Sequence, residues 1–403
     1  METRYMSNLL TCIIESKFCI GCGLCASMVG HDSIEMLEGD DGFIVPRQKV
    51  SNVDFTFLRD VCPGITLKQK CSLRGPESIY GHYESLYTAY STDQQIRWKA
   101  SSGGCITALL AFLIETGTVD EVLHVGKLMD SPLRSSAFAS KTRDATILGA
   151  GSRYAPSSLL YNWVKLLRTG KKIAVVGKPC DIAGVSQYLD VYPEYKEQVI
   201  CKISFLCMGL PSQNATKRLI DLFGLNEDEV QDFWYRGNGW PGMATVVAKD
   251  GRRFQLSYDD SWGTVLCKDV HFRCKICPDG FGSFADISCG DAWYTRNGRP
   301  NFDEQPGRSL AFIRTPVGQE IFNAAVKQGN LVVEHFNVND LKVIQKSQYH
   351  RKQYVGIRVF ALKVLGDHLL TFSGFKLTSN LRQTSIRKLV KEFLGTIRRR
   401  LSA

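Results

Sequence analysis

Three cysteines near the start of the chain have the spacing of ligands to an iron–sulfur cluster. Cys19, Cys22 and Cys25 form the pattern C-x2-C-x2-C. Three thiolates at this spacing wrap one face of a 4Fe–4S cubane, and the glycines between them let the backbone approach its sulfurs. The bacterial ferredoxin pattern continues with a Cys-Pro dipeptide, but Val29 and Gly30 occupy those positions here. The fourth ligand must therefore come from elsewhere.

A Cys-Pro dipeptide does occur later, at Cys62 and Pro63. We predict that Cys62 is the fourth ligand, with Cys71 as the competing candidate. Zinc is the alternative occupant, although zinc sites typically use two separated C-x2-C pairs rather than a close triplet. Because the chain has a single triplet, a two-cluster ferredoxin module is not expected.

Four further cysteines define a second candidate site. Cys274 and Cys277 form a C-x2-C pair, which by itself is compatible with zinc, a redox disulfide or a cluster. Cys180 follows the apolar stretch KIAVVG, and Cys207 ends the apolar stretch 200–207. If both stretches are strands, both cysteines emerge at carboxyl ends of strands, where open α/β sheets place their ligands. The alternative for either isolated cysteine is core packing.

The six remaining cysteines are interpreted as core or incidental thiols: Cys12, Cys71, Cys105, Cys201, Cys267 and Cys289. Cys201 precedes Cys207 by six residues, an even number, so the two side chains would share one face of a strand. Cys201 is therefore the leading alternative ligand for the second site.

The elements that must position these residues alternate between strands and helices. The sequence predicts strands at 172–177, 200–207 and 309–315, and helices at 101–116 and 181–189. Such alternation indicates an α/β (α+β) core with crossover helices. The chain is expected to divide into a small ferredoxin-like 4Fe–4S domain at 1–75, a cofactor-binding core at 80–300 and a C-terminal region at 301–403.

Composition narrows the class of protein. Fourteen cysteines are many for a chain of 403 residues. Disulfide scaffolds are usually small and secreted, whereas this chain is long and shows no export signal, so cluster ligation in the reducing cytoplasm is the better account. No apolar run approaches the roughly 18 residues that a membrane span needs.

The net charge of +10 is concentrated at the C-terminus. Residues 381–403 carry a net +6, from one acidic side chain, Glu392, and seven basic ones: Arg382, Arg387, Lys388, Lys391, Arg398, Arg399 and Arg400. The remaining chain is nearly balanced, so a nucleic-acid footprint is not expected.

The basic C-terminal segment also has a helical pattern. Its apolar residues Ile386, Leu389, Val390, Phe393 and Ile397 recur at three- and four-residue steps. Such a helix either packs on the protein's own core or docks on an anionic membrane surface.

Several motifs in the same order resemble the coenzyme F420 hydrogenase/dehydrogenase beta-subunit family. They are ASSGGCITALLAFLIETG at 100–117, GSRYAPS at 151–157, VVGKPCDIAGV at 175–185, SFLCMGLPS at 204–212, YRGNGWPG at 235–242 and RCKICPDGFGSFADISCGDAW at 273–293. The resemblance covers roughly residues 15–300. It implies FAD and a 4Fe–4S cluster in the core, and a second cluster in the N-terminal extension.

The resemblance also implies roles for individual residues. The core cluster would be held by Cys180, Cys207, Cys274 and Cys277. The flavin would be contacted by Ser101, Ser102, Gly103, Gly104, Ser152, Arg153 and Tyr154, with Arg153 pairing with the pyrophosphate. As a bare pattern, Ser101 to Gly104 is explained equally well by a serine that caps a helix.

Other polar residues receive weaker assignments. Gly237 to Gly242 pass near the cofactor or form a plain turn. Asp286 and Asp291 match family positions, but Asp291 could equally cap a turn. His31 and His271 are interpreted as surface or core residues rather than ligands.

The expected function is that of an iron–sulfur flavoprotein reductase or dehydrogenase. Electrons from a one-electron donor such as ferredoxin would pass through the two clusters and FAD to an organic substrate. A fused ferredoxin-like domain favours a self-contained enzyme; the alternative is a non-catalytic electron-transfer subunit of a larger complex. Tetrapyrrole reduction, deazaflavin oxidation and a sugar-pathway step all fit.

The forms GDAW and GWPG are more similar to family members from surface-polysaccharide gene clusters. A small-molecule or lipid-linked substrate is therefore expected. The protein is expected in the cytoplasm. A further hypothesis is that its C-terminal tail makes peripheral contact with the inner face of the membrane.

Overall fold

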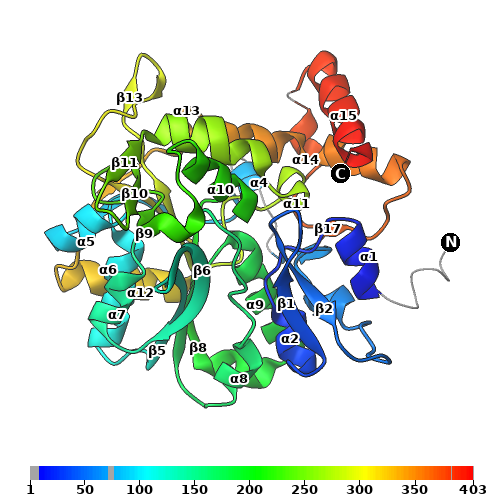
Figure 1. Cartoon of the computed structure of the whole chain (residues 1–403), viewed down its shortest axis with the longest axis horizontal. Coiled ribbons are helices and arrows are strands. Elements are labelled where there is room, and N and C mark those ends of the chain that lie inside the picture. The colour runs from blue at the N-terminus through cyan, green and yellow to red at the C-terminus, as the bar shows by residue number, and fades with distance from the viewer. Residues whose placement is uncertain (1–8, 71–76, 383, 403) are drawn as a thin grey trace.

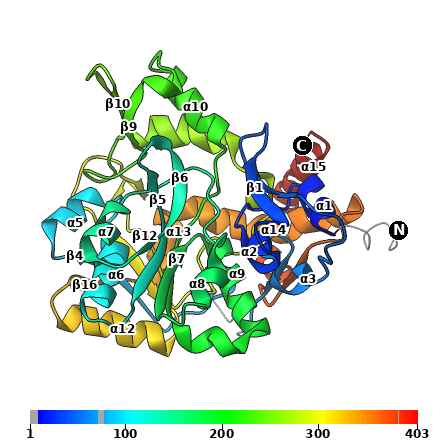
Figure 2. The ribbon, with the colours of Figure 1, turned by 60° about the horizontal axis from the view of Figure 1, so that its bottom comes forward.

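The computed structural model describes residues 9–70, 77–382 and 384–402. In this part of the chain a large mixed sheet has helices on both of its faces (Figures 1 and 2). Its eight strands within the described residues are β4 (Ser85–Ser91), β5 (Glu121–Leu128), β6 (Ser131–Ser140), β7 (Ile173–Gly177), β8 (Val199–Phe205), β12 (Ile287–Asp291), β15 (Ser309–Ile313) and β16 (Leu331–His335). The predicted α/β class is therefore confirmed.

The middle of this sheet is parallel and its edges are antiparallel. The strand order is β16-β4-β15-β12-β8-β7-β5-β6, with parallel pairing from β12 through β8 and β7 to β5. In the register, Gly177 at the end of β7 lies opposite Ser204 near the end of β8, and Ser204 lies opposite Ser288 of β12. The carboxyl ends of these strands therefore meet at one edge.

Alternate residues of β7 pack into two separate cores. Ile173 and Val175 belong to a core that contains Ile182 of helix α9 (Pro179–Val191), whereas Ala174 and Val176 belong to a core that contains Leu109 of helix α6 (Cys105–Glu115). This alternation, with every residue of β7 buried, is typical of a parallel strand covered on both faces.

The helices lie around this sheet and at one end of it. They are α4 (Glu77–Tyr80), α5 (Gln94–Lys99), α6 (Cys105–Glu115), α7 (Arg143–Leu148), α8 (Trp163–Leu167), α9 (Pro179–Val191), α10 (Gln213–Asp221), α11 (Phe272–Lys275), α12 (Pro316–Lys327), α13 (Leu341–Ile344), α14 (Lys346–Val364) and α15 (Ile386–Leu401). None of the helices in the described ranges combines the length and apolarity that crossing a membrane requires.

Small sheets complete the fold. A three-stranded antiparallel sheet consists of β9 (Val230–Trp234), β10 (Ala244–Ala248) and β11 (Arg253–Leu256). A parallel pair joins distant parts of the chain, since β3 (Thr66–Lys68) pairs with β17 (Thr371–Ser373). A short antiparallel pair is formed by β13 (Thr295–Arg296) and β14 (Arg299–Pro300).

The N-terminal cysteine-rich segment is built from short elements. These are α1 (Leu9–Glu15), α2 (Leu24–Val29), the hairpin of β1 (Ile34–Glu38) and β2 (Ile44–Gln48), and α3 (Leu58–Val61). Its buried side chains, such as Phe18, share a hydrophobic core with Trp163 of α8 and Ile182 of α9. The ferredoxin-like character of 1–75 and the three domain boundaries stay predictions, and Cys71 lies outside the described residues.

Two predicted element boundaries are wrong. The helix predicted at 101–116 begins only at Cys105, because Gly104 has a φ of 77°, which is left-handed and ends the preceding turn. The strand that contains Cys201 ends at Phe205, so Cys207 lies in the loop beyond it. In both cases the functional motif lies just outside the regular element, where the backbone is free to turn towards a ligand.

We predict that Gly103→Ala lowers the free energy of unfolding by about 1–3 kcal/mol, because its Cβ would overpack two strands. That Cβ would lie 2.5 Å from the carbonyl oxygen of Ala89 and 2.7 Å from the backbone nitrogen of Ser309. Chemical denaturation measures the loss. The matched control is Gly395→Ala in α15, where the nearest atom would be 3.5 Å away in the flexible Arg399 side chain. Equal effects of the two substitutions would contradict the prediction.

Candidate functional site

The structure brings the four cysteines of the first predicted set together. The pKa of Cys19 is raised to about 12, mainly by burial and in smaller part by the nearby thiol of Cys62. Burial and the same Cys62 thiol also raise the pKa of Cys22 and Cys25. These mutual effects place Cys62, as predicted, beside the triplet.

Backbone amides point at the sulfurs of this set. The amide of Gly21 bonds to the Cys19 thiol, and the amide of Ala26 bonds to the Cys25 thiol. Gly64 supplies another amide to Cys62, and a Cβ on Gly64 would lie 3.3 Å from the Cys62 sulfur. Hydrogen bonds to cysteine sulfurs and close backbone approach are what an iron–sulfur cluster requires of its protein.

The second predicted set lines a cavity of about 30 Å³. Cys180, Cys207, Cys274 and Cys277 all contribute to its wall. Burial and the thiol of Cys274 raise the pKa of Cys207, and the backbone nitrogen of Leu210 donates to the sulfur of Cys274 at 3.4 Å. Because β7 and β8 run parallel, the segments after them bring Cys180 and Cys207 to the same side of the C-x2-C loop.

Both sets fit a group larger than one ion. All thirteen described cysteines are free thiols. No three His, Cys, Asp or Glu side chains in the described ranges stand close enough together to hold a single metal ion. Each set consists of four buried or half-buried thiols with backbone amides directed at sulfurs of the set, a donor arrangement that fits a 4Fe–4S cluster.

Positive side chains surround the second cavity. Lys178 and Arg351 line it. Although burial alone would lower it, the pKa of Lys178 is raised by Asp181, whose Oδ2 lies 2.7 Å from the lysine Nζ. Arg351 donates to the carbonyl oxygen of Cys207. Cations at these positions would offset the negative charge of four thiolates.

His271 is buried, so of the two predicted positions, surface or core, the structure supports the core. Burial lowers its pKa to about 4, so the imidazole is neutral at physiological pH. His31 instead stacks on Tyr161, with ring centroids 3.9 Å apart.

A polar pocket of about 280 Å³ adjoins the second cavity. Lys178, Cys207, Gly209 and Leu210 line both spaces. The pocket thus lies directly against the second cysteine set.

Six of the seven predicted flavin-contact residues line this pocket: Ser101, Ser102, Gly104, Ser152, Arg153 and Tyr154. The exception is Gly103, which packs between the backbones of β4 and β15. Two buried oxygens in pocket residues, Asp181 Oδ1 and Gln348 Oε1, have no hydrogen-bond partner within the described part of the chain. Such orphaned polar atoms fit a polar ligand.

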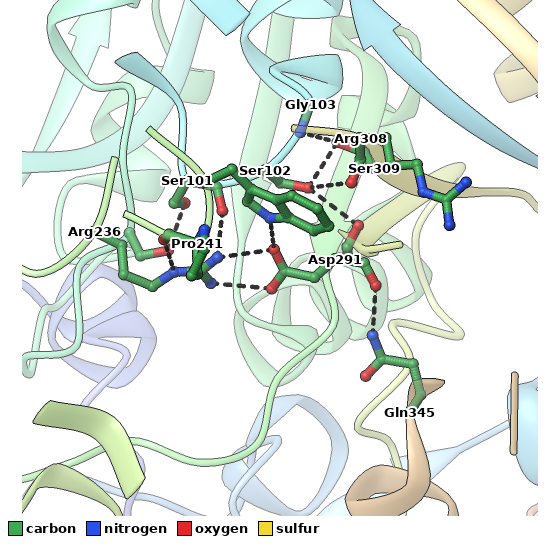
Figure 3. A network of polar contacts seen from close by, with 12 residues as sticks. Ser101, Ser102, Gly103, Arg236, Pro241, Asp291, Arg308, Ser309 and Gln345 are labelled. Carbon is green, nitrogen blue, oxygen red and sulfur yellow. Dashed lines mark hydrogen bonds and ion pairs between the residues drawn. The ribbon is translucent and has the colours of Figure 1, made fainter. Parts of the chain in front are cut away.

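An ion pair between Arg236 and Asp291 organises one wall of the pocket (Figure 3). Arg236 Nη1 and Nη2 each donate to a carboxylate oxygen of Asp291 at 3.0 Å. Nη2 also donates to the carbonyl oxygen of Ser101 at 2.6 Å, and Nε donates to that of Pro241 at 2.8 Å. The guanidinium therefore fixes the first serine motif to the loop that follows β9.

Asp291 has further partners in this wall. Trp240 Nε1 donates to its Oδ1 at 2.8 Å, and Gln345 donates to its backbone carbonyl oxygen at 2.7 Å. Asp291 is the last residue of β12 and therefore lies at the same sheet edge as Cys180 and Cys207. Asp286 instead accepts hydrogen bonds from the backbone of Lys202 and from Thr315, as a structural residue does.

The first serine motif is held by its own neighbours. Ser101 and Ser152 share a hydrogen bond of 2.6 Å between their hydroxyls, which joins the two predicted flavin motifs. Ser102 bonds to the Ser309 hydroxyl at 2.9 Å, and the amide of Gly103 donates to that same hydroxyl at 2.9 Å (Figure 3). The motif is therefore preorganised by the end of β15.

Arg153 is fixed by β6. Its Nη2 donates to the carbonyl oxygens of Pro132 and Arg134, both at 2.9 Å, and its Nε donates to Ser135 at 3.0 Å. These hydrogen-bond partners are neutral oxygens, so they do not compensate the charge of the guanidinium. No carboxylate among the residues that the structure describes lies within ion-pair distance of it. Arg153 thus brings a half-buried positive charge to the pocket.

Some pocket residues were missed from the sequence. The sequence analysis placed the YRGNGWPG motif near the cofactor or in a plain turn but did not single out its Arg236 and Trp240. The available signal was a charged residue within a motif that holds three glycines. Gln345 and Gln348 come from the C-terminal region, where no motif indicated a site.

Three of the described cysteines outside the two sets are fully buried, whereas Cys267 is exposed and Cys12 is half-buried. Cys201 is fully buried in the core between β8 and α6, so the even spacing from Cys207 does not bring it to the cavity. Its strand ends at Phe205, after which the chain turns. Cys105 and Cys289 are buried but also line the pocket.

Fold and site together define a mixed α/β protein with two buried four-cysteine groups and a polar pocket against one of them. Residues 86–163 match the N-terminal part, and residues 170–338 the C-terminal part, of the coenzyme F420 hydrogenase/dehydrogenase beta subunit. The chain belongs to this family.

Relatives support the same assignment. The chain is 28% identical over 267 residues to the coenzyme F420 hydrogenase subunit beta of Methanosarcina barkeri, covering 62% of this chain and 81% of the relative. It is 25% identical over 350 residues to the coenzyme F420-dependent sulfite reductase of Methanocaldococcus jannaschii, covering 82% of this chain and 50% of the relative.

A solved structure has the same fold. A chain of the F420-reducing NiFe hydrogenase complex from Methanosarcina barkeri superposes with a TM-score of 0.55 at 23% identity. The match covers 75% of this chain and 97% of that chain.

We predict that Cys180→Ala and Cys207→Ala each remove about half of the iron bound by the anaerobically purified protein, because each takes one ligand from the core cluster. The matched control is Cys201→Ala, which changes a buried cysteine of the neighbouring core and should leave the iron content unchanged. Iron analysis and the electron paramagnetic resonance spectrum of the reduced protein measure the outcome. Full iron in both ligand variants would show that these cysteines only pack.

We predict that Asp291→Asn lowers the free energy of unfolding by about 3 kcal/mol, because it leaves the buried Arg236 charge without its partner. Flavin content should fall with it, since Arg236 holds the Ser101 backbone. The control is Asp303→Asn, which breaks an exposed ion pair to Arg296 of 3.3 Å and should change stability little. Chemical denaturation and flavin absorbance distinguish the two variants; identical behaviour would argue against the role of the pair.

Proposed function

We propose that the chain is an electron-transferring oxidoreductase component that holds two 4Fe–4S clusters and FAD. The observation that carries the proposal is the wall shared by the second cysteine cavity and the polar pocket, to which Cys207 contributes on both sides. When bound, the clusters would carry single electrons and FAD would exchange one or two.

The residues of this chain bind and orient these groups. The first cluster would be held by Cys19, Cys22, Cys25 and Cys62, and the core cluster by Cys180, Cys207, Cys274 and Cys277. Arg153 offers its uncompensated charge to a pyrophosphate, and the paired hydroxyls of Ser101 and Ser152 offer hydrogen bonds. The aromatic side chains of Tyr258 and Trp293 provide apolar surface for a ring.

Two forms of this function are compatible with the site. Relatives named as beta subunits of F420-linked hydrogenase and formate dehydrogenase favour an electron-transfer subunit of a larger complex. A self-contained cytoplasmic reductase is the second candidate, with ferredoxin as donor and a small-molecule or lipid-linked substrate of surface-polysaccharide synthesis. The first cysteine set favours this second form, because it gives the chain its own electron inlet.

We expect anaerobically purified protein to be brown and to contain about eight iron atoms and one FAD per chain, as two four-cysteine sets and one pocket require. Metal analysis, flavin extraction and electron paramagnetic resonance measure this. Zinc in place of iron, or iron without flavin, would contradict the proposal. Turnover of an organic acceptor by the isolated chain with reduced ferredoxin would favour the self-contained enzyme, whereas turnover only with partner subunits would favour the subunit.

A further inference from the structure

The C-terminal helix α15 packs on α14 through one face. Arg358 of α14 pairs with Glu392 at 2.8 Å, and the rings of Phe360 and Phe393 have centroids 6.0 Å apart. Thr396 is buried at the same contact. The apolar face predicted from the sequence is therefore divided: Leu389, Phe393 and Ile397 are partly buried, whereas Ile386 and Val390 are exposed.

The exposed face of α15 presents two stripes. The apolar stripe consists of Ile386, Val390, Leu394 and Leu401, each at least 50% exposed. The basic stripe consists of Arg387, Lys388, Lys391 and Arg398. At 100° per residue these stripes lie next to each other on the helix. No carboxylate of the described residues lies within ion-pair distance of the basic stripe, so its four charges are uncompensated.

Helix α15 is attached to segments that carry ligands of both cysteine sets. Arg400 donates to the carbonyl oxygen of Ser16 at 3.2 Å and lies over the ring of Phe18, the residue before Cys19. Arg358, which holds Glu392 of α15, donates to the carbonyl oxygen of Lys275, the residue after Cys274. In Figures 1 and 2, α15 accordingly stands beside α14 and close to α1.

We propose that the exposed face of α15 is the docking surface for a negatively charged one-electron carrier protein, such as an acidic ferredoxin. This inference rests on the proposed function, which requires an electron inlet. Uncompensated cations steer an acidic partner and set its association rate, and a neighbouring apolar strip supplies contact area. Interfaces of electron-transfer partners are small, so one helix face is an adequate size. The attachment of α15 to both ligand segments favours a carrier protein over a membrane.

The test compares binding of an oxidised acidic two-cluster bacterial ferredoxin to three forms of the full chain by calorimetry at low ionic strength. The stripe variant carries Arg387→Glu, Lys388→Glu, Lys391→Glu and Arg398→Glu. The control variant has the same change in net charge from four exposed, unpaired cations elsewhere: Lys165→Glu, Arg168→Glu, Lys172→Glu and Lys196→Glu. We expect at least tenfold weaker binding for the stripe variant and a change within about threefold for the control.

Two further readouts complete the test. Val390→Gln with Leu394→Gln, which alters the apolar stripe without changing charge, should also weaken binding. In stopped-flow mixing, reduced ferredoxin should reduce the stripe variant at least tenfold more slowly, whereas dithionite should reduce all forms alike. Added salt should shrink the difference because it screens the charges.

The contrary outcomes are distinct. Unchanged ferredoxin binding by the stripe variant, or equal weakening in both charge variants, overturns the docking surface. Stripe-dependent sedimentation of the full chain with anionic phosphatidylglycerol vesicles, with ferredoxin binding unaffected, would assign α15 to a membrane instead. Ferredoxin binding without any reducible cluster would keep the docking surface and overturn the proposed function, because calorimetry does not depend on the clusters.

Discussion

The parallel pairing of β7, β8 and β12 is the constraint on which the site depends. Parallel strands end at the same edge of a sheet, and here the three segments that follow or end them carry Cys180, Cys207 and Asp291. Cys180 and Cys207 line the cysteine cavity, and Cys207 and Asp291 line the pocket. The cavity and the pocket are thus adjacent because of the strand register alone.

Buried charged side chains are the second important feature of this sheet edge. An isolated ion is costly to remove from water, so each buried charge needs a partner or a ligand. Arg236 has Asp291, and Lys178 has Asp181 at 2.7 Å. Lys352 and Arg351 form no ion pair within the described residues and donate to the carbonyl oxygens of Pro278 and Cys207, and burial lowers the pKa of Lys352 to about 8. Their positive charges would be balanced by ionised neighbouring thiols that hold the proposed cluster.

The C-terminal region contributes more to the site than its sequence suggests. The family match ends at residue 338, yet α14 lies beyond it and provides Gln348 and Arg351 to the two spaces. The pairing of β17 with β3 fixes the segment after α14 to the N-terminal cysteine segment. Residues from the last hundred positions of the chain therefore pack against the cysteine segments, which all lie within its first 277 residues.

The sequence by itself determined the C-x2-C-x2-C triplet and the C-x2-C pair, because thiol spacing is a local property that is readable without a fold. Cys180 and Cys207 were added through the family resemblance, and the ligand role of all eight cysteines stays a prediction. The sequence also determined the buried strand β7 and helix α9, since their apolar runs are unambiguous. The even spacing of Cys201 and Cys207 wrongly indicated that both side chains share one face of a strand. Such spacing guarantees a common face only while the strand continues, and β8 ends before Cys207. The tertiary structure alone decided the wall shared by the cavity and the pocket, the pairing of Arg236 with Asp291, and the part played by α14. Each of these joins residues more than fifty positions apart, and their proximity is set by strand register and helix packing, which no local pattern encodes.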